Sequence, residues 1–164
     1  MQHNKHRHHQ QNPHGNNPLF SYSLVTLQFT FIGLLIYMLF IQTPYIFNGT
    51  VLTLQILSAF IALWAALHLQ QKGHFNIVPD PRPNAVLVET GPYKTIRHPM
   101  YLSILLFFGV TITFQPTADS ILTLVLLAGI LLYKLNYEEQ LLVQKVMGYR
   151  KYQHQTKKLI PFVY

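Results

Sequence analysis

Two short segments, far apart in the chain, carry the residue types that could do chemistry. The first is Arg97-His98-Pro99, which leads directly into an apolar stretch. Proline is tolerated in the first turn of a helix because its missing N–H would have no partner there. We therefore expect His98 at a helix N-terminus, where the helix dipole and unpaired amide groups favour an anion such as a carboxylate. The alternative is that a single histidine before a proline is only a turn residue.

The second segment holds the only adjacent carboxylates in the chain, Glu138 and Glu139. Lys134 lies four residues before Glu138, so their side chains share one helix face. Both carboxylates follow an uncharged stretch, and carboxylates so close to hydrocarbon are costly unless they are paired or bound to a cation. Spacing alone supports two interpretations equally: a functional carboxylate, or a solvated helix end with an incidental ion pair.

The composition indicates a membrane protein with one domain. Of the 164 residues, 50% are hydrophobic and only 10% are Asp, Glu, Lys or Arg, whereas a soluble domain has about 25% charged residues. The chain has no cysteine, which excludes disulfides, thiolate metal sites and cysteine nucleophiles. Its 12 Lys and Arg against 5 Asp and Glu give a net charge of +7, which is typical of proteins that meet nucleic acid or an anionic membrane surface.

Uncharged runs predict an all-α integral membrane protein with four transmembrane helices. We expect these helices at about 19–41, 51–69, 100–115 and 119–147. A helix of about 20 residues rises about 30 Å, which is enough to cross the hydrocarbon layer. Pro116 and Asp119 fit a tight turn between the third and fourth helices. The fourth helix continues past Lys134, and we expect that long side chain to reach outward to the interface.

The basic residues all fall on one side of this topology. They precede the first helix, lie between the second and third, or end and follow the fourth, and the other two connections have none. This distribution predicts that both termini and the central loop are cytoplasmic, because loops rich in Lys and Arg stay on that side. Anionic lipid then accounts for the basic surplus, and a nucleic-acid partner is unnecessary.

The segments outside the predicted helices differ from one another. Residues 1–18 are rich in His, Asn and Gln, and we interpret them as a disordered tail before a single domain at 19–164. The histidines of this tail have no cysteine or carboxylate beside them to fix a coordination geometry, so we predict no specific metal site. The central loop, by contrast, is longer than an ordinary helix–helix connection, and with the segment after the fourth helix it is expected to form a cytoplasmic cofactor pocket.

The ordered set of motifs resembles the isoprenylcysteine carboxyl methyltransferases and the related phospholipid methyltransferases. The matching strings are GPYKTIRHPMY at Gly91–Tyr101, EE at Glu138-Glu139 and YRKYQHQTKKLIPF at Tyr149–Phe162. An apolar hairpin separates the first two strings, and the resemblance covers residues 73–162. Lys134 stands where this family has arginine, and lysine offers a point charge instead of a bidentate fork.

This resemblance implies a membrane-embedded enzyme that moves a methyl group from S-adenosylmethionine to a lipid or prenylated acceptor. Glu138 would contact the cofactor, and Lys134 would face the acceptor at the reaction centre. The other implied cofactor-binding residues are Ala85, Val86, Leu87, Val88, Tyr93, His98, Pro99, Met100 and Tyr101. The acceptor would be amphiphilic, either a lipid amine or a carboxyl group on an isoprenoid.

The chemistry of these side chains agrees with that implication. His98 at a helix start suits the carboxylate of the cofactor, and Glu138 suits a cationic or amide donor group. Tyrosine faces and the apolar run Val86–Val88 can pack a purine. Methyl transfer mainly requires that donor and acceptor be positioned and water excluded.

The alternative from a different class is a non-catalytic multi-pass membrane protein, such as an assembly factor or a small transporter that keeps the fold. A transport path usually needs ionisable residues inside the membrane, and apart from His68 the apolar runs offer none. A lipid-modifying reductase of similar architecture would need a nicotinamide site, and the sequence has no G-x-G-x-x-G.

Overall fold

The computed structural model describes residues 18–42, 48–71 and 86–164, and these residues are mostly helical. The five α-helices are α1 (Pro18–Ile36), α2 (Gly49–Gln71), α3 (Pro99–Phe114), α4 (Ala118–Lys145) and α5 (Tyr149–Gln155). A π-helix, η1 (Tyr37–Gln42), continues α1, and a short 3₁₀ helix, η2 (Gly91–Lys94), precedes α3. The described residues form no strand, only one isolated parallel bridge, so the predicted all-α fold class is confirmed for them.

The long helices lie close to the ranges expected from the sequence. Residues 18–42 are helical through α1 and η1, where the sequence predicts 19–41, and α4 ends at Lys145, where it predicts 147. The expected disordered tail falls almost entirely outside the described residues, which begin at Pro18 with the first turn of α1. The single domain at 19–164 stays a prediction.

Local sequence signals explain where α3 and α4 begin. Pro99 is the first residue of α3, and His98 is its N-cap. Thr117 caps α4: its side chain accepts a hydrogen bond from the backbone N–H of Ser120, and the Ser120 side chain accepts one from the backbone N–H of Thr117. This reciprocal pair satisfies two amide groups that a helix start otherwise leaves open. Asp119 in the first turn of α4 adds a favourable charge at the positive end of the helix dipole.

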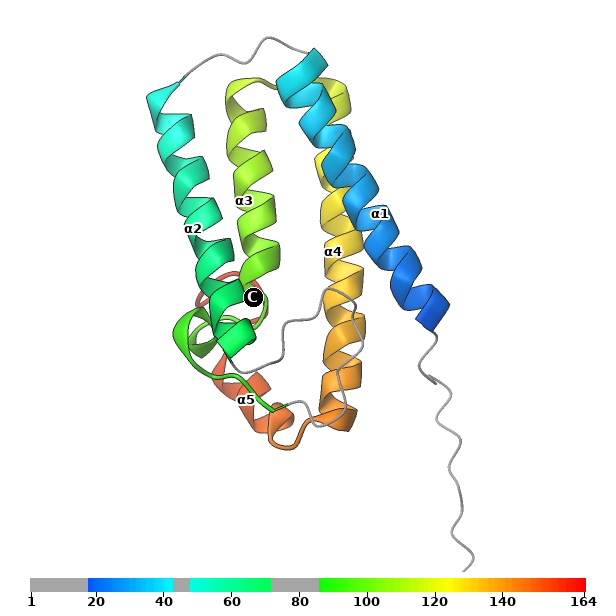
Figure 1. The fold of residues 1–164 in the computed structure, drawn as a ribbon, viewed down its shortest axis with the longest axis vertical. Helices are drawn as coiled ribbons and strands as arrows, with labels where there is room; N and C mark the ends of the chain where they lie inside the picture. Colours follow the sequence, from blue (N-terminus) through cyan, green and yellow to red (C-terminus); the bar gives the residue numbers. More distant parts are fainter. Residues whose placement is uncertain (1–17, 43–47, 72–85) are drawn as a thin grey trace, which may run out of the picture.

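The four long helices associate mainly as two pairs (Figure 1). α2 packs along α3, and α1 packs along α4. The largest buried apolar cluster lies between α1, α3 and α4 and includes Leu35, Phe108, Leu127, Leu131 and Leu135. Lipid gives helices no hydrophobic reason to associate, so close packing and interhelical hydrogen bonds hold such a bundle together.

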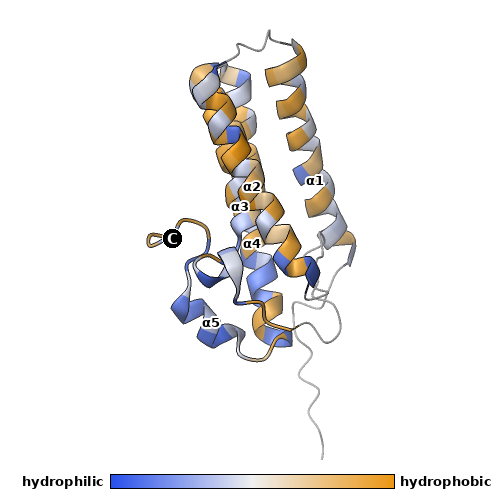
Figure 2. Cartoon of the chain, turned by 60° about the vertical axis from the view of Figure 1, so that its left-hand side comes forward, coloured by the Kyte–Doolittle hydropathy of each residue, from blue (hydrophilic) through white to orange (hydrophobic). Residues whose placement is uncertain are grey.

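The bundle is apolar over most of its length and polar at one end (Figure 2). Three stretches are long and apolar enough to cross a membrane, namely Pro18–Ile41, α2 and α4, while the apolar helix α3 is shorter, with 16 residues. Large apolar side chains such as Phe29, Phe60 and Val125 face outward from these helices. The polar end carries α5, the segment before α3 and the C-terminal segment (Figure 1), and it contains the motifs singled out in the sequence.

Candidate functional site

Backbone hydrogen bonds tie the C-terminal segment to the residues that lead into α3. The Lys157 N–H donates to the Thr95 carbonyl over 3.1 Å, and the Arg97 N–H donates to the Lys157 carbonyl over 2.8 Å. The His98 N–H donates to the Lys158 carbonyl over 3.0 Å. Two stretches far apart in sequence thus lie side by side, and the R-H-P motif is held against the end of the chain.

Glu139 is the centre of an ion-pair network that holds this arrangement. Its Oε1 accepts from Arg97 Nε over 2.5 Å, and its Oε2 accepts from Gln153 Nε2 over 3.1 Å. Lys158 Nζ lies 3.9 Å from the same carboxylate. Arg97 Nη1 also donates to the carbonyls of Gln153 and Thr156. A buried ion pair is tolerated when further hydrogen bonds satisfy both ions, and Glu139 meets this condition, so it serves the fold.

Glu138 faces a different set of groups. The Tyr101 hydroxyl donates to its Oε1 over 2.6 Å, and His98 Nδ1 lies 3.6 Å from its Oε2. The His98 and Tyr101 rings are stacked, with centroids 5.4 Å apart and planes 5° from parallel. His98 Nε2 lies 3.3 Å from Glu139, so the imidazole stands between the two carboxylates. The structure therefore brings His98, Tyr101 and Glu138 into contact, as one small site requires.

These contacts give His98 partners within the protein, and its binding to the cofactor stays a prediction. The sequence predicts that it faces a carboxylate of the cofactor, whereas in the structure both ring nitrogens face carboxylates of the protein. The start of α3 thus already has two carboxyl groups beside it. In this arrangement His98 positions Glu138 and Glu139.

Tyr93 contributes a buried hydroxyl that has no hydrogen-bond partner among the described residues. The residue belongs to η2 and is 6% exposed, and its carbonyl accepts from the Tyr152 hydroxyl over 2.6 Å. Burial raises the pKa of Tyr93, and the nearby Tyr152 and the charge of Glu138 raise it further. The phenol therefore stays a neutral donor close to Glu138. An unpaired buried polar group costs about 1–3 kcal/mol, so this hydroxyl fits a site that a polar ligand completes.

Gly91 lets the loop with Tyr93 approach α2. Its φ is +59°, and a Cβ there would lie 2.5 Å from His68 Nε2. His68, in the last turn of α2, is itself fixed by a 3.0 Å contact between Nδ1 and the Trp64 carbonyl. The sequence marks His68 only as the one ionisable residue within the apolar runs, and its contact with the Gly91 turn was missed.

The apolar run expected to cover the cofactor splits between two clusters. Val88 packs with Ala65 and Tyr93, whereas Leu87 packs against a separate cluster around Tyr149. Val86 is 64% exposed. Only Val88 of the described part of this run therefore packs against a residue of the candidate site.

The remaining predicted cofactor residues have the following positions. Ala85 lies outside the described residues. Pro99 is fully buried at the start of α3, and Met100 packs beside the cluster that contains Tyr93 and Val88. Met100 and Val88 thus form an apolar flank next to Tyr93.

Lys134 is buried inside the bundle, and the sequence-based expectation that its side chain extends outward is wrong. Its side chain is 1% exposed, and its ammonium donates to Gln28 Oε1 of α1 over 2.8 Å. The ammonium also lies 5.3 Å from the centroid of the Tyr101 ring, within the range of a cation–π interaction. The physical reason is that α1 supplies a polar partner inside the bundle, Gln28, which lowers the cost of burying the ammonium.

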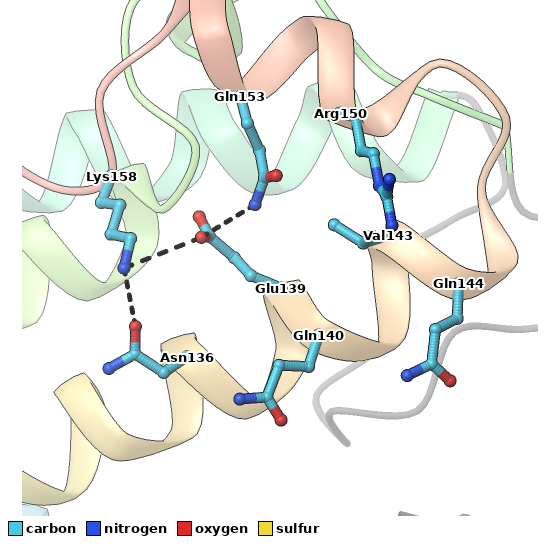
Figure 3. A pocket seen from close by; sticks show the side chains of 8 residues that line it. All are labelled: Asn136, Glu139, Gln140, Val143, Gln144, Arg150, Gln153 and Lys158. Carbon is cyan, nitrogen blue, oxygen red and sulfur yellow. Dashed lines mark hydrogen bonds and ion pairs between the residues drawn. The ribbon is translucent and has the colours of Figure 1, made fainter. Parts of the chain in front are cut away.

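A pocket of about 580 Å³ lies beside Glu139 and is lined by residues of α4, α5 and the C-terminal segment (Figure 3). Eight residues line it, most of them polar: Asn136, Glu139, Gln140, Val143, Gln144, Arg150, Gln153 and Lys158. Figure 3 shows the Glu139 side chain directed toward Gln153 and Lys158, and Lys158 also donates to Asn136 over 2.7 Å. None of the described residues predicted to bind cofactor lines this pocket. Of those residues, His98, Tyr101 and Glu138 contact one another where α3 begins.

Comparison with known proteins identifies the segment that carries this site. Residues 46–150 match the family described as phospholipid methyltransferase (PEMT). The match includes α2, α3, α4 and the loop with Tyr93 and His98, and it leaves out α1. No curated protein matches the chain.

Proposed function

Because this chain belongs to the phospholipid methyltransferase family, we propose that it transfers a methyl group from S-adenosylmethionine to an amphiphilic lipid-type acceptor. The observation that carries the proposal is the contact between the two motifs. His98 and Glu138, 40 positions apart, approach to 3.6 Å at the polar end of an apolar bundle. Such a position serves a water-soluble methyl donor and a membrane-bound acceptor at once.

The chain's own residues fit the cofactor. When bound, S-adenosylmethionine supplies an activated methyl group on a sulfonium. Glu138, held by Tyr101, would accept hydrogen bonds from its amino or hydroxyl groups and balance its positive charge. The Tyr93 hydroxyl, which lacks a described partner, would donate to it. Val88 and Met100 would supply an apolar surface beside these polar groups.

Lys134 is the residue we assign to the acceptor. Its ammonium lies against the Tyr101 ring, on the side of the site that faces α1. A fixed cation can hold a carboxylate or the phosphate of a lipid headgroup in line for transfer. A carboxylate acceptor needs no general base, so the residues around Lys134 mainly position it and exclude water. A lipid amine would have to enter as the free amine, its proton lost to water, before its nitrogen takes the methyl group and the neutral thioether of the cofactor leaves.

We also propose that α3 is the fourth crossing helix and that the polar end lies in the cytoplasm. α2 and α4 end, and α1 and α3 begin, toward the same end of the bundle (Figure 1). The residues after α4 place several cations at that end, among them Lys151, Lys157 and Lys158. Positive charge beside membrane helices favours the cytoplasmic side. The site would then open where soluble S-adenosylmethionine is available.

The test is methyl transfer by the purified protein in lipid nanodiscs. The protein is incubated with methyl-labelled S-adenosylmethionine and a total lipid extract, and the labelled products are separated and identified. We expect label in an amphiphilic product, and at least tenfold less in the Glu138→Ala variant. Absence of labelled lipid, together with absence of cofactor binding, would instead favour a non-catalytic membrane protein that keeps the fold.

A further inference from the structure

A buried polar pair joins α1 to α4 inside the bundle. Lys134 Nζ donates to Gln28 Oε1 over 2.8 Å, and Gln28 is only 5% exposed. Among the fully buried side chains of the described residues, that of Lys134 is the largest by residue volume. A lysine in such a place is costly unless polar groups surround its ammonium. The amide oxygen of Gln28 is one such group, and it comes from a helix that the family match does not include.

The pair connects directly to the candidate site. The Lys134 ammonium lies 5.3 Å from the Tyr101 ring centroid, and the Tyr101 hydroxyl donates to Glu138. A continuous series of contacts therefore runs from α1 to the carboxylate that we assign to the cofactor. A shift of the ammonium by a few ångströms would take it out of contact with the Tyr101 ring and with an acceptor bound beside that ring.

Lysine needs such a partner more than arginine does. Its ammonium is a point charge on a flexible four-carbon stem, whereas a guanidinium is a rigid planar fork. A flexible stem leaves the charge in several positions unless a fixed group restrains it. Gln28 restrains it from the neighbouring helix, and this restraint lowers the entropy that must be lost when an acceptor is positioned.

We propose that Gln28 is a positioning residue that fixes the Lys134 ammonium against an anionic oxygen of the acceptor. This inference rests on the proposed methyl transfer. It gives α1, through Gln28, a part in selecting the acceptor. The anionic oxygen belongs either to a carboxylate, as in a prenylated cysteine, or to the phosphate of a phospholipid. Gln28 acts through Lys134 and touches neither the cofactor nor the transferred methyl group.

The chain provides a matched control in Gln55. This glutamine is 6% exposed, and its Nε2 donates to Thr111 Oγ1 over 2.7 Å, which joins α2 to α3. Thr111 lies 13 residues after His98, about 20 Å farther along α3 at 1.5 Å per residue. Gln28 and Gln55 thus make similar interhelical contacts, and the Gln28 contact leads to the site through Lys134, whereas the Gln55–Thr111 contact lies far along α3 from it.

The test compares Gln28→Met, Gln55→Met, Lys134→Met and the double variant of Gln28 and Lys134. Methionine keeps the length of a glutamine side chain and, at position 134, the length of the lysine stem without its ammonium, and in each case it removes the polar end. Vesicles containing phosphatidylethanolamine or a prenylated cysteine carboxylate serve as acceptors. The measurements are kcat/KM for each acceptor, the Kd for S-adenosylmethionine and the melting temperature.

We expect Gln28→Met to lower kcat/KM for the preferred acceptor at least tenfold and to change the cofactor Kd less than twofold. Gln55→Met should lose a similar amount of thermal stability and keep kcat/KM within twofold. In the Lys134→Met background, the Gln28 substitution should have little further effect, because a residue that acts through another shows no independent contribution.

Two results would overturn the inference. One is an equal loss of kcat/KM in the Gln28 and Gln55 variants, which would make both contacts purely structural. The other is additive loss in the double variant. Failure of the proposed function looks different, because the unsubstituted protein would then transfer methyl groups to neither acceptor and would not bind the cofactor.

Discussion

Glu138 and Glu139 are neighbours in the sequence, and the fold gives them opposite surroundings. Glu139 is bound by Arg97 and Gln153 and holds the C-terminal segment in place. Glu138 accepts a hydrogen bond from Tyr101, and its Oε2 lies 3.6 Å from His98 Nδ1. Successive residues of a helix point about 100° apart, so one carboxylate meets the tail and the other meets the loop before α3. A pair of identical side chains thus divides into one that ties the C-terminal segment to the R-H-P motif and one that faces Tyr101 and His98.

The largest effect on the free energy of unfolding is expected when the ion-pair network around Glu139 is broken. Arg97→Met removes the cation and leaves Glu139 as a buried charge with weaker partners, which should lower the free energy of unfolding by about 3–5 kcal/mol. Thermal unfolding in detergent measures the loss. The double substitution with Glu139→Leu removes both charges and should recover most of the stability. A loss below about 1 kcal/mol in the single variant would mean that the network does not hold the fold.

A smaller structural effect is expected at Gly91, which places the loop of Tyr93. Gly91→Ala forces an alanine to φ +59° and brings its Cβ to 2.5 Å from His68 Nε2. The left-handed conformation alone costs about 1–2 kcal/mol, and the contact with His68 adds to it. Adding His68→Ala should restore only the part due to that contact. If it restores nothing, the imidazole does not lie against the turn.

The smallest effect on stability is expected at Tyr93. Tyr93→Phe removes a buried hydroxyl that has no described partner, so stability should stay the same or rise by up to about 1 kcal/mol. Tyr101→Phe is the matched control, and it should lose stability because its hydroxyl donates to Glu138. Cofactor affinity should fall about two- to tenfold in Tyr93→Phe, the range for one hydrogen bond. Unchanged affinity would exclude the Tyr93 hydroxyl from the cofactor site.

The fold was largely predictable from the sequence, because its signals are local. Long uncharged runs give the apolar helices, and Pro99 and Pro116 mark where α3 starts and where α3 and α4 separate. The R-H-P and E-E strings also pointed to the residues that meet at the polar end. Each of these signals lies within a few residues of the feature it predicts.

The rest depends on contacts between distant residues, which a single sequence does not reveal. Both Arg97 and Glu139 belong to recognised motifs, yet their pairing across 42 positions has no local signal. Lys134 was expected to extend outward because no nearby residue in the sequence indicates its partner. That partner, Gln28, is 106 positions away on α1. The sequence predicted that Val86–Val88 forms one apolar surface. In the structure, Val88 and Leu87 pack in two different clusters.

The most direct test of the division between the two carboxylates is calorimetric titration of S-adenosylmethionine into the Glu138→Gln variant. Glutamine keeps an oxygen that can accept from Tyr101 and replaces the oxygen that faces His98 with an uncharged NH2 group, which can donate to a neutral imidazole, so the melting temperature should stay close to that of the unsubstituted protein. A hydrogen bond to a charged group contributes about 1.5–3 kcal/mol, which predicts a loss of affinity of about 10- to 100-fold. Unchanged affinity in the folded variant would contradict the assignment of Glu138 to the cofactor.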